Sequence, residues 1–308
     1  VTGIDDDVWS LNGDHFAELT TIVSDPVTDP VADPVSDPAD DTPTCRVTSR
    51  CVTGERRIEV GVAAVHSVAS PTADPEPVVP APGEPGVTGV RWRLRAARGD
   101  AITVTSTMAV GSSNDDDVTG SPVEAAVATA RSGAEHGYRA LVAASAARWA
   151  EFWASADVRI EGDLAAQAAL RFSTYHNRIA LPAHSDRLPV GARGLSCQAY
   201  QGAAFWDQEM FNLPAVLHTH PDIARRLLVY RWRTLDGARR KARRLGYQGA
   251  FFAWISGDTG DELCPDFFFT DVLTGRPIRN HFNVWQIHVS PDIAHTVWRY
   301  WEATGDVD

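Results

Sequence analysis

A change in hydrophobic spacing near Ser121 constrains the fold of this 308-residue chain more than any other feature. Before that point, apolar residues lie two apart in the segments 57–62 and 101–106, which is the spacing of half-buried strands. After it, the apolar residues of 123–130 follow the three-to-four-residue spacing of a helix. The sequence therefore predicts an α+β chain of several domains, with the β part first.

The first part is predicted to be an antiparallel β-sandwich over residues 1–120, because alternation recurs throughout 45–110. A low-complexity stretch at 25–41 repeats Asp-Pro every four residues. Proline removes backbone donors and the aspartates repel one another, so this stretch is interpreted as an acidic surface loop. A second proline-rich loop is predicted at 71–87.

The second part is predicted to be helical. Residues 121–156 form a linker of two helices that separate near Gly133, and 157–308 form a further domain. Within that domain, helices are predicted over 163–180, 221–235 and 237–245, with a last one that begins at Ser290-Pro291-Asp292 and stops before Gly305. Successive helices joined by loops rich in Trp, Gly and Asp are typical of an α/α toroid whose loops form a binding face.

The charge composition narrows the choice of partners. Lys+Arg is 28 and Asp+Glu is 40, which gives a net charge of −12 and argues against a nucleic-acid or anionic-membrane partner. No apolar run approaches the roughly 18 residues of a membrane helix. Lys241 is the only lysine in the sequence. This bias fits either GC-rich coding or a salt-adapted surface, and the two can coexist.

The four cysteines do not indicate a metal site. Cys45, Cys51, Cys197 and Cys264 form no CxxC pair and lack zinc-site spacing. A Cys45–Cys51 bridge is conceivable only in an exported protein, and free thiols are expected for the other two. No charged segment followed by an apolar core begins the sequence, so we expect a cytoplasmic protein.

Three clusters carry the residues capable of chemistry. They comprise Trp206, Asp207 and Glu209 in 193–214; Trp254, Asp258, Asp261 and Glu262 in 246–265; and Gln286 with His288 before the last helix. Tryptophan faces beside carboxylates suit a polyhydroxylated ligand. The apolar C–H face of a sugar packs on the ring, and its hydroxyls donate to the carboxylate.

Each of these residues also has a purely structural interpretation. Trp206 and Trp254 are equally consistent with core packing, and Asp207 with a helix N-cap. Asp258 fits a turn. His288, on what is expected to be an apolar strand, is more typical of a core histidine. Dinucleotide, Walker, HExxH and GxSxG motifs are absent from the sequence.

Several segments together resemble glycoside hydrolase family 65, which contains maltose, trehalose and kojibiose phosphorylases and some α-glucoside hydrolases. The resemblance begins with Asp-Val-Arg-Ile-Glu-Gly-Asp at 157–163, Arg171-Phe172, and Phe-Trp-Asp-Gln-Glu at 205–209. It covers about 120–308. It continues through Pro221-Asp222-Ile223-Ala224-Arg225, the run at 230–239, Trp254, Asp258-Thr259-Gly260, Cys264-Pro265, Ile287-His288 and Asp292-Ile293-Ala294.

This resemblance implies a β-sandwich, a helical linker and the first half of an (α/α)6 catalytic barrel. It also implies inverting cleavage of an α-glucosidic bond in a disaccharide substrate. Phosphate as the attacking group would give β-glucose 1-phosphate, and water would make the protein a hydrolase. Inorganic phosphate would be a co-substrate, with no cofactor and no metal, and the complete enzyme would be a homodimer.

By position, the resemblance assigns Trp206 and Asp207 as the wall and hydroxyl clamp of a glucose subsite, and Trp254 as a second wall. Glu209, Asp258 and His288 are expected to support that pocket from behind. The family's general acid, a Glu in a Gly-Pro-Asp-Glu-like segment, is expected beyond residue 308. We therefore expect no catalytic residue within 1–308, and we expect these 308 residues alone to be inactive. A non-catalytic carbohydrate-binding relative is the alternative.

Three positions depart from the family pattern. They are Ala203, where a His is usual; Ile255, where a Glu is usual; and Val284, within a stretch that is usually acidic. The usual groups would reach toward the pocket or its rim. The departures indicate either a different bound sugar or a divergent branch.

Overall fold

The computed structural model describes residues 16–23, 44–54, 56–70, 76–78, 89–194 and 199–307. The chain divides into two compact units, residues 14–152 and 153–308, and each is treated by itself. The Asp-Pro repeat at 25–41, most of the predicted loop at 71–87, and Cys197 lie outside the described residues.

The first unit contains an antiparallel four-stranded sheet. Its strand order is β1 (Phe16–Val23), β2 (Thr44–Thr53), β3 (Glu59–Ala69) and β6 (Thr103–Ser112). A short β4 (Glu76–Val78) pairs with β5 (Arg91–Arg93). The two predicted strands thus exist, each beginning two residues later than expected. The prediction of loop throughout 71–87 is wrong at β4, because its three residues pair with β5 across the intervening chain.

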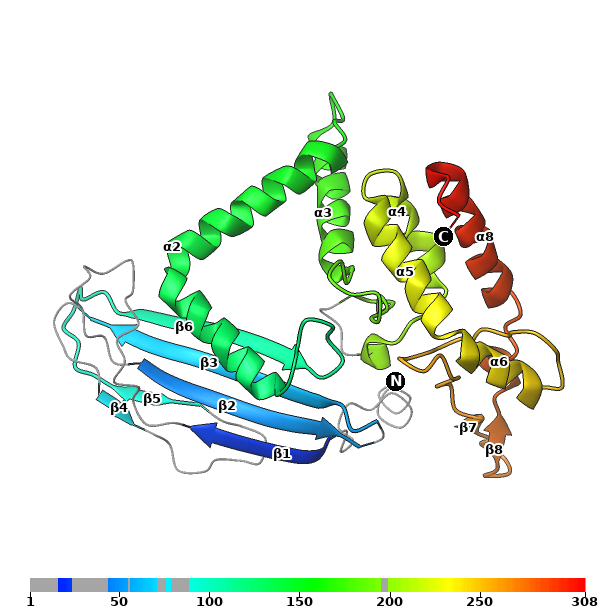
Figure 1. The fold of residues 1–308 in the computed structure, drawn as a ribbon, viewed down its shortest axis with the longest axis horizontal. Coiled ribbons are helices and arrows are strands. Elements are labelled where there is room, and N and C mark those ends of the chain that lie inside the picture. Colours follow the sequence, from blue (N-terminus) through cyan, green and yellow to red (C-terminus); the bar gives the residue numbers. More distant parts are fainter. Residues whose placement is uncertain are drawn as a thin grey trace. The chain divides into compact units, whose positions relative to one another are not determined.

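Helix α2 (Pro122–Ala156) begins against one face of this sheet (Figure 1). Ala126 and Ala130 of the helix pack on Ala63, Val65 and Ala109 of strands β3 and β6. Small side chains on both surfaces allow the backbones to approach closely. At Gly61, a Cβ atom would lie only 2.4 Å from the carbonyl carbon of Pro122.

The break in α2 is at Gly137, not at the predicted Gly133. Gly137 has φ 74° and ψ 163°, a conformation that glycine adopts without steric cost. Gly133 keeps its helical conformation and serves a different purpose. A Cβ there would lie 2.9 Å from the Thr107 methyl group, so this glycine lets the helix pass close to β6.

The cysteines of the sheet are free thiols. Cys45 and Cys51 are both buried and both lie on β2. Six residues of one strand separate their Cα atoms by about 20 Å, far beyond disulfide reach. Cys264 of the second unit is also free and buried.

The second unit is mainly helical. Its helices are α3 (Leu164–Ala180), α4 (Pro214–Leu217), α5 (Pro221–Arg233), α6 (Leu235–Arg244), α7 (His281–Val284) and α8 (Val289–Thr304), with a 3-10 turn η1 (Ala199–Gly202) and a π-helix η2 (Gln208–Asn212). A hairpin joins β7 (Phe267–Thr270) to β8 (Pro277–Arg279). Helix α5 contacts both α4 and α8. Leu213, Leu217, Ile223 and Leu227 form the buried centre of this packing.

Local sequence signals set most helix ends. Asp163 caps α3 by accepting a hydrogen bond from the Ala166 amide at 2.9 Å. Gly305 ends α8 in the left-handed region, at φ 68°. The predicted cap at Ser290 is wrong, because α8 already begins at Val289. The Ser290 hydroxyl instead accepts a hydrogen bond from the Phe252 amide at 3.1 Å.

Among the described residues, no helix combines the length and the apolar content that crossing a membrane requires.

Candidate functional site

Two segments some fifty residues apart meet through the backbone of Ala204. Ala204 bridges to Gly191 on one side and to Ser256 on the other. Its amide donates to the Ser256 carbonyl at 2.8 Å, and the Ser256 amide donates back at 3.0 Å. This pairing brings the Phe-Trp-Asp-Gln-Glu segment at 205–209 beside the loop at 251–264.

An aromatic cluster, defined as Phe205, Trp206, Trp254 and His288, forms where these segments meet the start of α8. The His288 ring stands edge-on to Trp206 at a centroid distance of 5.0 Å and to Trp254 at 5.9 Å. Phe205 lies 6.1 Å from Trp254. Phe205 is buried, but the other three rings are half-buried, so part of each remains accessible to a ligand.

His288 occupies the N-cap position of α8, so the prediction that it lies on an apolar strand is wrong. Its Nδ1 lies 2.7 Å from the Asp292 carboxylate, one helical turn along. Such a contact orients an imidazole ring and leaves its second nitrogen for another partner. His288 is therefore held in place by its own helix while it faces the two tryptophans.

Asp207 stands immediately before the π-helix η2. Its backbone is helical and its side chain makes no capping hydrogen bond, so the N-cap interpretation is wrong. The carboxylate is half-buried and bonds to no other described residue. Its burial raises the pKa of Asp207 above the ordinary 3.8, and a bond to its own backbone amide acts in the opposite direction. An unpaired, partly desolvated carboxylate of this kind is free to accept hydroxyl donors.

Glu209, two residues further, is wholly buried and fully paired. Both its oxygens accept from the Arg231 guanidinium at 2.8 Å, and Gln208 donates to it at 2.7 Å. Arg231 also donates to the Phe205 carbonyl at 2.9 Å and to the Ser256 hydroxyl at 3.2 Å. The pair thus joins the two segments, and the Glu209 side chain is 0% exposed, so its oxygens are not accessible to a ligand.

The remaining acids of the 251–264 loop have different environments. Asp258 is exposed and lies in a turn, as predicted. In this turn the Gly260 amide donates a hydrogen bond to the Gly257 carbonyl at 3.3 Å. Asp261 pairs with Arg240 at 2.7 Å. Glu262 is buried and pairs with Lys241 at 2.7 Å. Sequence reasoning missed Arg231 and Lys241, because neither lies near its partner in the chain.

The three departures from the family pattern are neighbours in space. Ala203, Ile255 and Val284 are all buried in one apolar cluster with Phe205 and Cys264. Trp206 and Trp254 pack against this cluster. The three positions therefore lie behind the tryptophans in the core of the unit, and not on an exposed rim.

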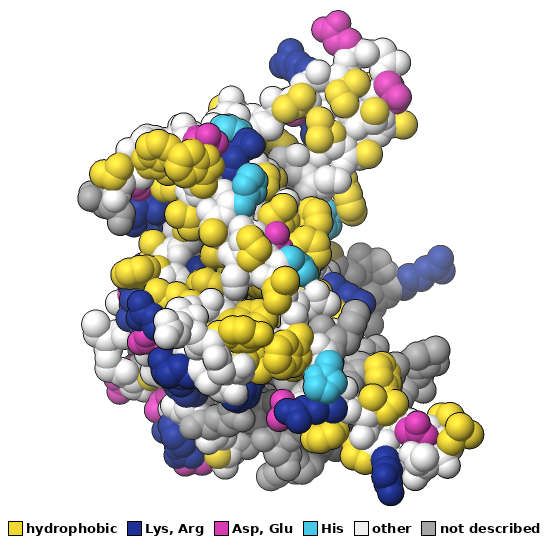
Figure 2. Space-filling view, turned by 90° about the vertical axis from the view of Figure 1, so that its right-hand side faces the viewer, with side chains coloured by type: hydrophobic (Ala, Val, Ile, Leu, Met, Phe, Trp, Pro, Cys, Tyr) yellow, Lys and Arg dark blue, Asp and Glu magenta, His cyan; other side chains and the backbone are white. Residues whose placement is uncertain are grey.

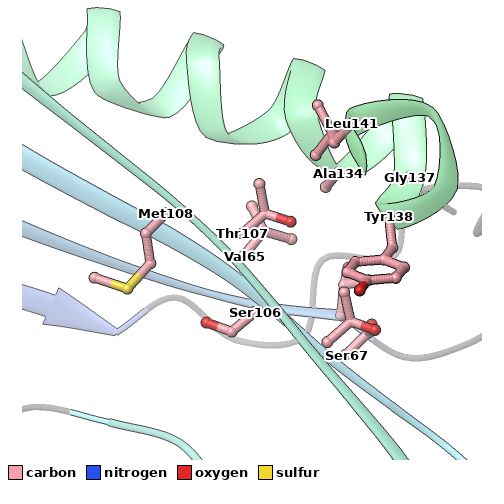
Figure 3. A pocket seen from close by; sticks show the side chains of 11 residues that line it. Val65, Ser67, Ser106, Thr107, Met108, Ala134, Gly137, Tyr138 and Leu141 are labelled. Atoms are coloured by element: carbon pink, nitrogen blue, oxygen red, sulfur yellow. The ribbon is translucent and has the colours of Figure 1, made fainter. Parts of the chain in front are cut away.

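A cavity of about 290 Å³ in the first unit is a poor candidate for this chemistry (Figure 3). It lies between β3, β6 and the region of α2 around Gly137. Its lining is apolar or carries hydroxyl groups, as in Val65, Ser67, Met108 and Tyr138. No Asp, Glu, His, Lys or Arg is among the described lining residues, so they offer no charged group for recognition of a ligand.

Comparison with known proteins matches both units to one family. Residues 1–152 match the model described as "Glycosyl hydrolase family 65, N-terminal domain". Residues 171–308 match the "Glycosyl hydrolase family 65 central catalytic domain". Together the two matches leave only residues 153–170 uncovered.

Individual relatives agree with these matches. The chain is 47% identical over 305 residues to a 1,2-alpha-glucosylglycerol phosphorylase of Bacillus selenitireducens, covering 99% of this chain and 36% of the relative. It is 38% identical over 158 residues to a kojibiose hydrolase of Flavobacterium johnsoniae, covering 51% of this chain and 21% of the relative. A solved structure from the human microbiome, assigned as a kojibiose phosphorylase, superposes with a TM-score of 0.63 at 19% identity. The superposition covers 85% of this chain and 32% of the solved chain, and it supports the fold alone. The chain spans about a third of the length of the glucosylglycerol phosphorylase.

Proposed function

Because the chain belongs to glycoside hydrolase family 65, we propose that the full-length protein cleaves an α-glucosidic bond with inversion, with phosphate as the attacking group. The observation that carries this proposal is the unpaired carboxylate of Asp207 beside the aromatic cluster. A relative that matches nearly the whole chain is a phosphorylase, and this favours phosphate over water.

Under this proposal, the half-buried rings of Trp206 and Trp254 receive the apolar faces of a glucose unit. Sugar C–H groups pack on aromatic rings and gain burial without losing hydrogen bonds. Asp207 accepts one or two glucose hydroxyls in charge-assisted hydrogen bonds. His288, oriented by Asp292, completes the wall between the two tryptophans. Glu209 and Arg231 hold the two segments together and take no part in the chemistry.

The proposed reaction breaks the bond between the anomeric carbon and the leaving oxygen. A general acid protonates that oxygen while a phosphate oxygen attacks the opposite face of the carbon, which gives β-glucose 1-phosphate and the released alcohol. Phosphate is already anionic, so no second carboxylate is needed to activate it. The acid is a Glu that we expect beyond residue 308. No metal or cofactor is part of this scheme, and phosphate acts as a co-substrate.

We further propose that 1–120 is a β-sandwich, 121–156 a linker, and 157–308 the first half of an (α/α)6 barrel. Exposed apolar side chains support an incomplete barrel. Leu164 of α3 is 88% exposed, Phe172 of the same helix 65%, and Trp298 of α8 55%. Figure 2 shows hydrophobic side chains gathered over much of one face. Such patches are typical of surfaces that meet another part of a protein.

The test uses the full-length gene product and a panel of α-glucosides that includes 2-O-α-glucosylglycerol and kojibiose. Each substrate is incubated with and without inorganic phosphate, and the products are resolved by anomer-sensitive NMR. We expect phosphate-dependent release of β-glucose 1-phosphate. α-Glucose 1-phosphate as the product would contradict inversion.

Hydrolysis is the second candidate, because a kojibiose hydrolase is also similar to this chain. Phosphate-independent release of free β-glucose would select it. Glucose binding without turnover of any α-glucoside would instead identify a non-catalytic carbohydrate-binding relative. A cytoplasmic location and a homodimer are further proposals, checked by cell fractionation and by sedimentation equilibrium.

A further inference from the structure

The loop at 251–264, which carries Trp254, is fastened to helix α6 by the chain's only lysine. The Lys241 side chain is 1% exposed, and its ammonium group lies 2.7 Å from the Glu262 carboxylate. The same ammonium donates to the Phe252 carbonyl at 3.3 Å and lies 4.4 Å from the centre of the Phe251 ring. Lys241 therefore contacts the loop at three points.

Glu262 extends this fastening to the backbone on both sides of the loop. One carboxylate oxygen accepts from the Trp254 amide at 2.9 Å, in addition to Lys241. The other oxygen accepts from the amides of Ile255 at 3.1 Å and Cys264 at 3.2 Å. Glu262 is as buried as Lys241, so water does not compete for these bonds. The amide of Trp254 is thereby fixed relative to α6.

The choice of lysine at 241 is informative, because all the other 27 basic residues are arginines. A tetrahedral ammonium on a thin stem fits between an aromatic face, a carbonyl and a carboxylate. A planar guanidinium is larger and directs its donors in a fixed fork. The single lysine of the sequence thus stands where its ammonium group contacts a carboxylate, a carbonyl and an aromatic face.

An adjacent ion pair provides a contrast. Arg240, on the same helix, donates through two nitrogens to Asp261 at 2.7 Å each. Its partner belongs to the same loop, but the two side chains are 47% and 45% exposed. Arg240 and Asp261 make no contact with the backbone of Trp254 among the described interactions, and exposed pairs contribute little to stability.

We propose that Lys241 and Glu262 are positioning residues that set the Trp254 ring for binding of the glucosyl group. They act through the loop backbone and do not touch the sugar. The inference rests on the proposed function, because it requires Trp254 to be a wall of the glucose site. Burial lowers the pKa of Lys241, and the Glu262 carboxylate opposes that change and keeps the ammonium paired.

The test compares Lys241→Met and Glu262→Gln with the control Arg240→Met in the full-length protein. Glucose binding is measured by titration calorimetry, which reports affinity and stoichiometry separately. KM and kcat for the preferred α-glucoside are measured in parallel. We expect both buried variants to raise the glucose Kd and the KM about tenfold or more with one binding site per chain retained, because small misplacements of a binding group are costly. Arg240→Met should stay within about twofold of the wild type.

Two outcomes overturn the inference. Affinity within about twofold of wild type in a folded Lys241→Met or Glu262→Gln variant removes the positioning role. A reduced stoichiometry with unchanged affinity shows that the pair is merely structural, since it lowers only the folded fraction. The Glu262→Gln variant keeps the side-chain shape and serves if Lys241→Met does not fold. A wild-type protein that neither binds glucose nor cleaves α-glucosides would instead refute the proposed function itself.

Discussion

Asp207 and Glu209 are carboxylates two residues apart whose environments assign them opposite roles. Glu209 is buried against Arg231, and removing one partner of such a pair leaves an uncompensated charge, which is far more costly than loss of a surface pair. Asp207 bonds to no other described residue and is only half-buried. The first therefore maintains the structure, whereas the second is available to a ligand.

Under the proposed function, the raised pKa of Asp207 predicts the acid limit of glucose binding. Hydroxyl donors bind the ionised carboxylate through charge-assisted hydrogen bonds that the protonated acid does not make, so binding is strong above the folded-state pKa and is weakened as the pH falls through it. Burial raises that pKa, so the loss should begin above the ordinary value of 3.8. Glucose titrations of the full-length protein between about pH 3.5 and pH 7 will check this.

Asp207→Asn is the matched variant for this measurement. It should weaken glucose binding at neutral pH by about tenfold or more and remove the acid limit, since one charge-assisted bond contributes roughly 1.5–3 kcal/mol. The folded state binds the Asp207 proton more tightly than the unfolded state, so ionisation of Asp207 destabilises the fold as the pH rises. Asp207→Asn should therefore raise Tm at neutral pH. Unchanged binding and an unchanged pH profile would show that Asp207 does not face the sugar.

At this scale, the aromatic and acidic candidates were predictable but their partners were not. Trp206, Trp254 and His288 were found because aromatic and acidic residues cluster in the sequence, and the structure brings the three together. Arg231 and Lys241 lie 22 and 21 residues from the carboxylates they pair with. Each belongs to a basic helix, and only the packing of that helix distinguishes one buried cation from its exposed neighbours.

Among the elements, the contact between β3 and the start of α2 depends on a glycine. A Cβ at Gly61 would lie 2.4 Å from two backbone atoms, in Pro122 and Val123. Backbone atoms of a helix start cannot rotate away as a flexible side chain can. The strand and the helix must therefore separate if any larger residue stands at this position.

Gly61→Ala is accordingly predicted to lower the free energy of unfolding by about 1–3 kcal/mol through overpacking. Urea unfolding followed by circular dichroism measures the change. Gly89→Ala is the control, because a Cβ there meets nothing within 4 Å, and its effect should stay within about 0.5 kcal/mol. Equal stabilities for the two variants would mean that the helix start shifts without cost.

Helix ends were largely predictable and the break in α2 was not. Asp163, Pro221 and Gly305 act through hydrogen bonds and dihedral preferences within a few residues, so their roles can be inferred locally. Gly133 and Gly137 look alike in sequence. Gly133 allows the helix to approach Thr107 closely, and Gly137 allows the positive φ at the break. The packing of the helix on the sheet determines which glycine has which role.

For the whole molecule, the net charge of −12 predicts a dependence of stability on salt. Repulsion among unscreened carboxylates disfavours the compact state, and salt reduces it because the Debye length falls from about 10 Å at 0.1 M to about 3 Å at 1 M. If the lysine-poor surface is a salt adaptation, Tm at neutral pH should rise with KCl over this range. Differential scanning calorimetry of the full-length protein measures it.

The control is the same series at the measured isoelectric point of the full-length protein, where the net charge is small and the gain from salt should shrink. A Tm that is flat in KCl at both pH values would favour coding bias as the origin of the composition.

The sequence by itself determined the order of the β and helical parts, several helix ends, and the segments that carry Trp206, Asp207 and Trp254, because periodicity, capping and composition are local properties. The tertiary structure alone decided which carboxylate stays free and which is paired, that His288 belongs to a helix, and that Ala203, Ile255 and Val284 share one core. These features depend on contacts between residues distant in the chain. Such contacts exist only once the packing of helices and loops has fixed the distances between them.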